Sequence, residues 1–350
     1  MTHTPAGQPA TLAAPPRGPS AATGPDGQAL DDLMPEALAP DALTPDDLAR
    51  IVQAPGWQGG HVAVVDLAAG PVVVKGCRPA RSVGSYRLRY QALNTLARVL
   101  GLPFLKAAPA HGGERGQAVE VARLRALRAP GAPVPAVLHV APSHFVMQWL
   151  GRDHLATLLH ARHPQAAALW QEAGQALVRL HAAGQYLSQG FARNIIVNTR
   201  AQPPRLGGMI DFEDDPLEVM PLPEAQLRDW LAFLHSSLWM LPLSTAEVDA
   251  CLDTWLASES PAVRALFARA CQRLGWLRHL PASRRLGRDT LALQVTAACA
   301  HRYAQRAARA SAARASATPV PDARAPDAAQ QPATPMPPAP QGRAASHQKP

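Results

Sequence analysis

The pattern of apolar residues changes once along this 350-residue chain, and the change limits the folds that it can adopt. Valine-rich segments within 61–77 predict two strands joined by an Ala-Ala-Gly turn, and the segment 133–151 predicts two more. From Pro164 onward, apolar residues recur at intervals of three and four, which is typical of amphipathic helices. The sequence therefore predicts a bilobal α+β protein, with a small β-rich lobe at 43–150 and a larger helical lobe at 151–309.

The two ends of the chain differ in composition from the part between them. Residues 1–42 are mainly Ala, Pro, Gly and Thr with scattered acids, and residues 310–350 form an Ala/Pro/Arg/Ser segment. Neither segment has the apolar periodicity that would bury enough surface to offset the entropy lost on ordering. We expect both to be disordered tails, of which the second is basic.

Several features bear on where the protein is located. The N-terminal segment lacks the apolar stretch of a secretory signal peptide. The most apolar run, LAFLHSSLWMLPL, is shorter than the roughly 20 residues that span a bilayer. The four cysteines are far apart and show no zinc-site or disulfide-framework spacing, which suits a reducing compartment. We therefore expect a cytoplasmic protein.

The charge distribution limits the expected partners. The net charge of +8 comes largely from arginines in the C-terminal tail and in the predicted helices, with no aromatic residues between them. Nucleic-acid binding is therefore not expected. The basic tail is expected to make at most a weak peripheral contact with an anionic membrane.

Four short motifs carry the candidate functional residues. Of the 34 Lys and Arg residues only three are lysines, and one of them, Lys75, ends the predicted strand VVVK. Glu120 lies in the predicted helix QAVEVARL. Asn194 closes the polar stretch SQGFARN before an apolar IIV, and Asp211 follows Met-Ile in MIDFE.

In this order, the motifs within residues 56–239 resemble the protein-kinase-like fold. The nearest likeness is to the bacterial lipopolysaccharide kinases that act on Kdo or heptose, with RIO-type and aminoglycoside kinases more distant. The resemblance implies an ATP-binding phosphotransferase with a sugar or lipopolysaccharide-type acceptor. Lys75 would contact the α- and β-phosphates and Glu120 would hold that lysine. Asn194 and Asp211 would bind Mg²⁺, a hard cation that prefers oxygen ligands.

The same resemblance assigns weaker roles to other positions. Gln148 and Trp149 stand where the hinge between the lobes would contact adenine through backbone groups. Gly59 and Gly60 would form a shortened loop over the phosphates, since the full GxGxxG pattern is missing. Asp229, in LRDWLAFL, would support the catalytic loop from beneath.

One position departs from the family pattern. The catalytic aspartate of the family lies five residues before the metal-binding asparagine, and here that position is Gln189, whose amide cannot accept a proton. Glu213, Asp214 and Asp215 are candidates to replace it. Three hypotheses stay open: an atypical kinase, a pseudokinase that binds nucleotide and acts on a protein partner as a regulatory or scaffold module, and a scaffold that binds no nucleotide.

Overall fold

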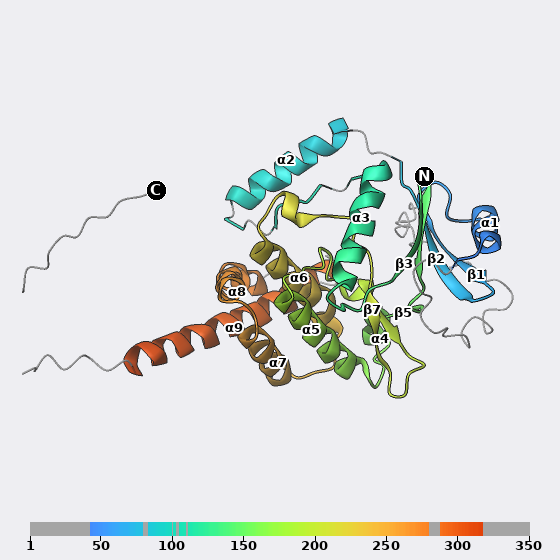
Figure 1. The fold of residues 1–350 in the computed structure, drawn as a ribbon. Helices are drawn as coiled ribbons and strands as arrows, with labels where there is room; N and C mark the ends of the chain where they lie inside the picture. Colours follow the sequence, from blue (N-terminus) through green and yellow to red (C-terminus); the bar gives the residue numbers. More distant parts are fainter. Residues whose placement is uncertain are drawn as a thin grey trace, which may run out of the picture. The chain divides into compact units, whose positions relative to one another are not determined.

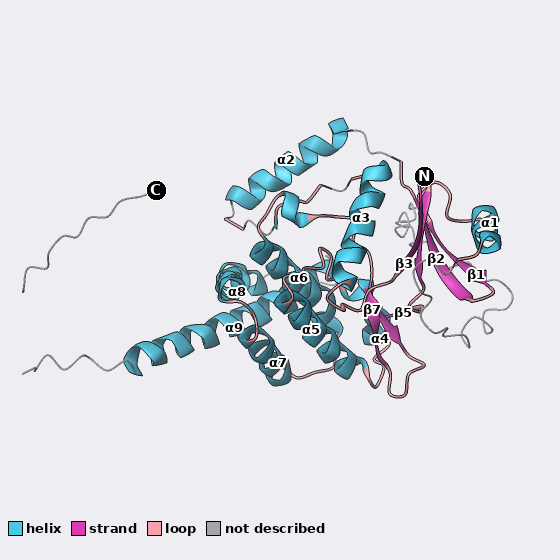
Figure 2. Cartoon of the chain, in the orientation of Figure 1, coloured by secondary structure: helices cyan, strands magenta, loops and turns pink. Residues whose placement is uncertain are grey.

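The fold is mixed α+β, with two small antiparallel sheets and a larger number of helices (Figures 1 and 2). The computed structural model describes residues 43–79, 83–99, 101–102, 105–109, 111–279 and 288–317. The predicted tail at 1–42 and residues 318–350 of the second tail lie outside the described residues.

The first sheet contains the strands that the sequence predicts. Its strands are β1 (Val62–Leu67), β2 (Gly70–Gly76), β3 (Val137–Ala141) and β4 (His144–Gln148). All pair antiparallel in the order β1-β2-β4-β3, so β2 and β4 are the central strands. Side chains of β1 alternate between exposed and buried positions, whereas β2 is buried along almost its whole length. Lys75 lies near the end of this buried strand.

The alternation of side chains along β2 decides which way Lys75 faces. Val72 and Val74 pack in a small core with Ile51 of α1 (Pro45–Gln53). Val73 instead packs against the main core. Lys75 has the same parity as Val73, so its side chain lies on the face that carries α3.

Three helices precede β3 along the chain: α1 (Pro45–Gln53), α2 (Val83–Val99) and α3 (Gly113–Arg128). Helix α1 begins with a capping box in which Thr44 and Asp47 exchange backbone and side-chain hydrogen bonds. Figure 1 shows α3 between the first sheet and the helices that follow. Its residues Val121, Leu124 and Leu127 are buried in the main core. Helix α3 is therefore fixed on the same side of the sheet as Lys75.

The helical part contains a second sheet at its start. This sheet consists of β5 (Asp153–His154), β6 (Ile195–Asn198) and β7 (Arg205–Met209). The helices are α4 (Leu155–His160), α5 (Ala166–Ala182), α6 (Leu222–Ser237), α7 (Thr245–Ala257), α8 (Pro261–Leu274) and α9 (Arg288–Ala317). Buried residues of these elements form one continuous core with Phe145 and Met147 of β4.

The structure differs from the sequence prediction at two places. The short elements β5 and α4 were not predicted, because two and six residues carry too little periodicity. Helix α9 continues to Ala317, beyond the predicted start of the tail at 310. Its last turns are rich in Ala, the residue with the highest helix propensity. The described residues up to Ala307 belong to one compact unit and those from Ala308 to a second.

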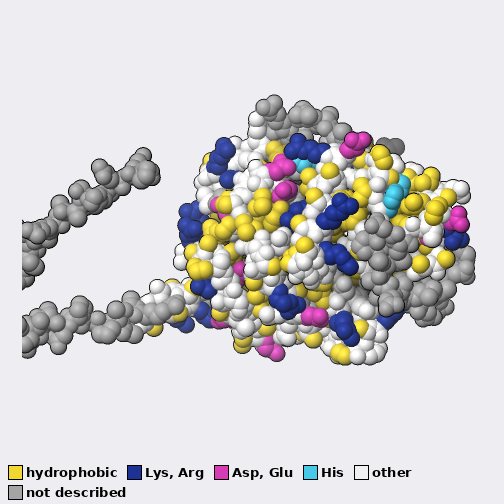
Figure 3. Space-filling model, viewed as in Figure 1, with side chains coloured by type: hydrophobic (Ala, Val, Ile, Leu, Met, Phe, Trp, Pro, Cys, Tyr) yellow, Lys and Arg dark blue, Asp and Glu magenta, His cyan; other side chains and the backbone are white. Residues whose placement is uncertain are grey.

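Three further features of the described residues bear on the sequence expectations: membrane-spanning helices, surface charge and the cysteines. In the part of the chain that the structure describes, no helix combines the length and the apolar character needed to cross a membrane. On the face drawn in Figure 3, Lys and Arg side chains of the described residues are scattered among acidic and apolar ones rather than gathered in one patch. The cysteines Cys77, Cys251, Cys271 and Cys299 are all free thiols, as the sequence predicts.

The centre of the main core is a cluster of aromatic rings from three helices. The rings of Trp170 and Trp255 lie 4.8 Å apart, those of Trp230 and Trp255 5.6 Å apart, and Phe233 stacks on Trp170 at 5.6 Å. Gly174, one turn after Trp170, leaves the space into which Trp255 fits: a Cβ there would lie 2.3 Å from Trp255 Cζ2.

We predict that Gly174→Ala destabilises the protein. Alanine favours a helix by about 1 kcal/mol over glycine, but overpacking a rigid buried ring costs about 1–3 kcal/mol. We expect a net loss of up to about 2 kcal/mol and a fall of up to several degrees in the thermal midpoint, measured by circular dichroism. Ala168→Met, at an exposed position of α5, is the control and should leave the midpoint nearly unchanged. A Gly174→Ala variant more stable than wild type would contradict this packing.

Candidate functional site

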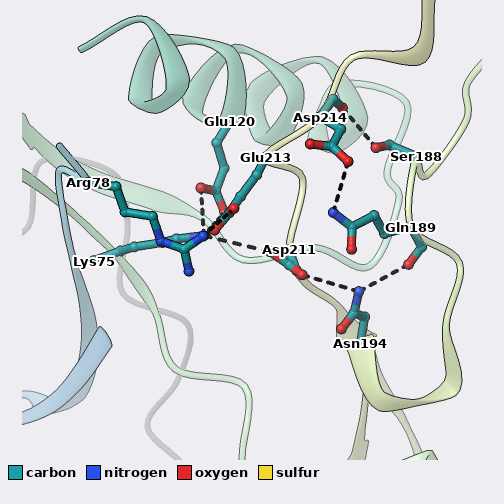
Figure 4. Close-up of polar contacts among 9 residues, drawn as sticks. All are labelled: Lys75, Arg78, Glu120, Ser188, Gln189, Asn194, Asp211, Glu213 and Asp214. Carbon is teal, nitrogen blue, oxygen red and sulfur yellow. Dashed lines mark hydrogen bonds and ion pairs between the residues drawn. The ribbon is translucent and has the colours of Figure 1, made fainter. Parts of the chain in front are cut away.

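The ammonium group of Lys75 lies in a buried cluster of carboxylates (Figure 4). Only 7% of Lys75 is exposed. Its Nζ is 2.8 Å from both carboxylate oxygens of Glu120 on α3. Burial alone would lower the pKa of Lys75, but the carboxylates of Glu120, Glu213 and Asp211 outweigh burial and raise it. Lys75 is therefore charged, and the pairing with Glu120 that the sequence predicts is present.

Two further carboxylates come from the segment after β7. Asp211 Oδ1 lies 3.8 Å from Lys75 Nζ, and Glu213 Oε1 lies 2.8 Å from it. The other oxygen of Glu213 is 2.6 Å from Arg78 Nη1. Between them Phe212 is buried in the main core, which fixes the segment. Asp211 has φ 74°, a left-handed conformation that is uncommon outside glycine and is concentrated at functional sites.

Asn194 faces Asp211 from the opposite side of the cluster (Figure 4). It ends the 3₁₀ turn η3 (Ala192–Asn194) directly before β6. Its amide nitrogen donates to Asp211 Oδ2 at 3.4 Å and to the backbone oxygen of Gln189 at 3.1 Å. The backbone oxygen of Asn194 accepts from the N–H of Ile210 at 2.9 Å. These bonds use the amide hydrogens, so the amide oxygen is left to act as a ligand.

The residues around Asp211 fit Mg²⁺ only in part. Within the described ranges, no three or more His, Cys, Asp or Glu side chains are grouped so as to hold a metal ion by themselves. Asn194 and Asp211 offer oxygen donors, which Mg²⁺ prefers, and Mg²⁺ commonly takes its other ligands from water and phosphate. The donor set therefore suits Mg²⁺ that arrives together with a phosphate-bearing molecule.

The structure distinguishes among the three acids considered as replacements for the missing aspartate. Glu213 is held between Lys75 and Arg78, as described above. Asp215 accepts from the hydroxyl of Tyr186 at 2.6 Å and caps the next 3₁₀ turn, η4 (Pro216–Glu218). Asp214 Oδ2 accepts from Nε2 of Gln189 at 3.3 Å. Of the three acids, Asp214 is the one whose carboxylate faces the side chain of Gln189.

The loop between α5 and η3, which carries Gln189, is held by α6. The N–H of Leu187 donates to Asp229 Oδ2 at 2.6 Å, and Asp229 is completely buried. Gly190 lies against the same helix, where a Cβ would be 2.9 Å from the backbone oxygen of Asp229. Ser188, at φ 78°, donates its hydroxyl to the backbone oxygen of Asp214 at 2.8 Å. Asp229 thus supports this loop, as the sequence predicts.

Asp229 belongs to a buried network that the sequence does not reveal. His181 of α5 lies between two carboxylates, with Nε2 3.4 Å from Asp229 Oδ2 and Nδ1 2.6 Å from Glu259 Oε1. Trp230 Nε1 donates to the same oxygen of Glu259 at 2.7 Å. Burial alone would lower the pKa of His181, but the hydrogen bonds to Asp229 and Glu259 outweigh it and raise the pKa. The His181 ring therefore links α5 and α6 to Glu259, which lies between α7 and α8.

Four residues assigned by resemblance take no part in the ion pairs of Lys75. Gln148 pairs with Val72, toward the other end of β2, and exchanges hydrogen bonds with the backbone of Ala136. Trp149 is the next residue. Gly59 and Gly60 form a turn with positive φ before β1. A Cβ at Gly60 would lie 2.7 Å from the Cα of Arg78, so the turn runs beside the chain that follows Lys75.

Arg193 lies directly before Asn194. Its guanidinium lies over the ring of Phe191, at 4.1 Å from the ring centre.

A cavity lies beside the Lys75 ammonium, between the end of β2 and the start of α3. Its walls include Lys75, Glu120, Glu213 and Arg78. The other lining residues are Gly76, Cys77, His111, Gly112, Gly113, Gly116, Gln117 and Phe145. Arg78 was not among the predicted site residues, because one more arginine in an arginine-rich chain carries no signal.

Acidic side chains lie on both sides of Asp211. Lys75 and Arg78 are accompanied by the carboxylates of Glu120, Asp211 and Glu213. The carboxylate of Asp214 lies on the side of Gln189 (Figure 4).

Comparisons with known proteins assign the chain to no family. It matches no family model and no curated protein sequence. What can be inferred about function therefore depends on the motifs and on the geometry described above.

The buried position of His181 leads to a prediction about pH. Because its pKa is raised in the folded state, the protonated form contributes stability that is complete below the unfolded value of about 6.5 and is lost as pH rises through the folded pKa. We expect the free energy of unfolding, from urea titrations between pH 6 and 9, to fall with rising pH by at most about 1.4 kcal/mol per pH unit from this group. His181→Gln should flatten this fall.

The control is His160→Gln, at an exposed position of α4, which should keep the wild-type pH dependence. Parallel profiles for His181→Gln and wild type would mean that folding does not raise the pKa of His181.

Proposed function

We propose that this chain is an ATP-binding phosphotransferase of protein-kinase-like fold, acting on a sugar or lipopolysaccharide-type acceptor. The observation that carries the proposal is the convergence of four segments on one site. Lys75 from β2 and Glu120 from α3 form a buried ion pair, and Asp211 joins that pair to Asn194. These are the residue types that phosphoryl transfer requires: a cation for phosphates, an acid that holds it, and oxygen ligands for Mg²⁺.

The arrangement of the lobes supports the same proposal. A four-stranded antiparallel sheet with α3 on one face precedes a mainly helical part. We assign the first to the N-lobe at 43–150 and the second to the C-lobe at 151–309. In this assignment Gln148 and Trp149 connect the lobes and contact adenine, and Gly59 and Gly60 lie above the phosphates.

Each residue of the site has a role in the proposed reaction. Lys75 binds α- and β-phosphate oxygens, while Glu120 keeps the ammonium directed into the site. Asn194 and Asp211 would hold Mg²⁺, which when bound supplies charge neutralisation at the phosphates. Asp229 keeps the Gln189 loop in place through the N–H of Leu187.

We assign the general base to Asp214. Gln189 can orient an acceptor hydroxyl by hydrogen bonding but cannot take its proton. The Asp214 carboxylate is 3.3 Å from the Gln189 amide, so it is close to the position that the family's aspartate would occupy. As the acceptor oxygen bonds to the transferred phosphorus and the bond to ADP breaks, the hydroxyl proton passes to Asp214.

The second candidate function is that of a pseudokinase that binds nucleotide and acts through a protein partner. One observation favours it: the side chain at the base position is an amide. A general base contributes typically 10²–10⁴-fold to a rate. If Asp214 does not serve, the chain retains the nucleotide site without efficient turnover.

The first test is of nucleotide binding. We expect ATP to bind in a Mg²⁺-dependent manner, measured by isothermal titration calorimetry with and without MgCl₂. Lys75→Met should weaken ATP binding at least tenfold, because the phosphates lose a charge-assisted partner and Glu120 is left unpaired. Asp211→Ala should remove the dependence on Mg²⁺.

Lys106→Met is the matched control for Lys75→Met. Lys106 donates to the backbone oxygen of Val219 at 3.4 Å and lies outside the carboxylate cluster, so its loss should leave ATP affinity unchanged. Equal ATP affinity in wild type, Lys75→Met and Asp211→Ala would refute the nucleotide site.

The second test concerns the base. If Asp214 accepts the proton, Asp214→Asn should lower ATP hydrolysis at least 100-fold, measured by a coupled ADP-release assay. Gln189→Asp should then have little effect. Asp215→Asn is the control and should leave ATP hydrolysis nearly unchanged, because the carboxylate of Asp215 accepts a hydrogen bond from Tyr186.

Two other outcomes would change the assignment. A rise of tenfold or more in Gln189→Asp, with an unaffected Asp214→Asn variant, would mean that the wild type works without a base. Binding of ATP without turnover in wild type and in every variant would support the pseudokinase instead.

A further inference from the structure

The carboxylate of Glu213 bridges two cations that come from the same stretch of chain. Its Oε1 lies 2.8 Å from Lys75 Nζ and its Oε2 lies 2.6 Å from Arg78 Nη1. Both contacts have the short distances of charge-assisted hydrogen bonds. A phosphate group makes the same kind of contact with a lysine and an arginine that lie side by side. Glu213 therefore occupies an anion site formed by Lys75 and Arg78.

Lys75 does not need Glu213 for charge balance. Glu120 alone contacts Nζ at 2.8 Å through both oxygens and is itself only 3% exposed. Each further carboxylate makes the surroundings of the ammonium more negative. Like charges at these distances repel strongly where water is largely excluded. A polyphosphate that approaches Lys75 therefore meets repulsion from Glu213 as well as attraction from the lysine.

The site is accessible from the side of Arg78. The Arg78 side chain is 46% exposed, whereas that of Lys75 is 9% exposed and that of Glu213 is 20% exposed. All three line the cavity between β2 and α3. An incoming anion can therefore reach the guanidinium first and then displace the Glu213 carboxylate from the ammonium.

We propose that Lys75 and Arg78 together form a polyphosphate-binding site and that Glu213 acts as its internal competitor, which a nucleotide must displace. The proposal rests on the proposed function for the identity of the nucleotide, but the anion site can be tested without one. It assigns Arg78 a phosphate-binding role and gives Glu213 a restraining role in place of a catalytic one.

The experiment measures binding of inorganic tripolyphosphate by titration calorimetry in the presence of EDTA. Glu213→Gln keeps the shape of the side chain but removes its charge, so it should bind tripolyphosphate about tenfold more tightly than wild type. Adding Arg78→Gln to that variant should reverse most of the gain. Arg78→Gln alone, at a largely exposed side chain, should bind more weakly than wild type.

Glu218→Gln is the matched control for charge. Glu218 is an acid of the same segment, paired with His111 at 2.6 Å and with Arg115 at 3.6 Å, and it is not a partner of Lys75 or Arg78. Its substitution removes an equal charge and should change tripolyphosphate affinity less than twofold. If Glu218→Gln raised tripolyphosphate affinity as much as Glu213→Gln does, the effect of Glu213→Gln would be explained by net charge alone. That result would overturn the proposal.

Other results also overturn it. Unchanged or weaker tripolyphosphate binding by Glu213→Gln, with a wild-type thermal midpoint, would mean that Glu213 does not compete for the site. If Glu213→Gln were unstable, Arg78→Gln would decide, since wild-type affinity in that variant excludes Arg78 from the site.

A parallel titration with ATP and Mg²⁺ separates this proposal from the proposed function. Tighter tripolyphosphate binding by Glu213→Gln, with no ATP binding by any variant, would support the anion site and reject the nucleotide function. If ATP binding depends on Lys75 but is not strengthened by Glu213→Gln, the nucleotide function is supported. The role of Glu213 as a competitor of the phosphates is then rejected.

Discussion

The buried ammonium of Lys75 is the constraint on which the rest of the site depends. A charge in the centre of a sheet is costly unless carboxylates compensate it, and the compensation comes from segments far apart in the chain. Glu120 must be brought by α3, which fixes that helix against β2 and β4. Asp211 and Glu213 must be brought by the turn after β7, which fixes the second sheet beside the first. One buried charge thus links both sheets.

The buried carboxylate of Asp229 holds the loop that carries Gln189 in a similar way. Asp229 is fully buried, and its Oδ2 accepts from the Leu187 N–H and contacts His181. Its other carboxylate oxygen has no hydrogen-bond partner among the described residues. Such an oxygen is tolerated only where other contacts hold the side chain firmly. His181 supplies such a contact to Asp229, and Glu259 holds His181 from its other side, so the loop depends in part on this histidine of α5.

The sequence predicts contacts well where they follow from local pattern and poorly where they join distant segments. Strand alternation places Lys75 on the face opposite Val72. The pairing of Lys75 with Glu120 is what the resemblance to the kinase-like fold implies, and the ion pair is present. Asn194 and Asp211 are predictable because each adjoins a strand of one hairpin-like pair, β6 and β7. The contact of Arg78 with Glu213 spans 135 residues, and that of His181 with Glu259 spans 78. Neither contact can be predicted from the residues around it, because Arg, His and Glu are common on protein surfaces and only the fold brings these side chains together.

The energetic character of the Lys75 cluster bears on which of the three hypotheses is to be preferred. Replacing a buried ion pair by well-packed apolar residues is often neutral or stabilising. A scaffold that binds no ligand could therefore hold β2 against α3 with a leucine and a methionine, and would gain nothing from three carboxylates around one ammonium. A site that binds phosphates together with Mg²⁺, as proposed above, would use the lysine at the phosphates and Asp211 with Asn194 at the metal. On that proposal, the difference between a kinase and a pseudokinase depends on whether the Asp214 carboxylate can take a proton that the Gln189 amide cannot.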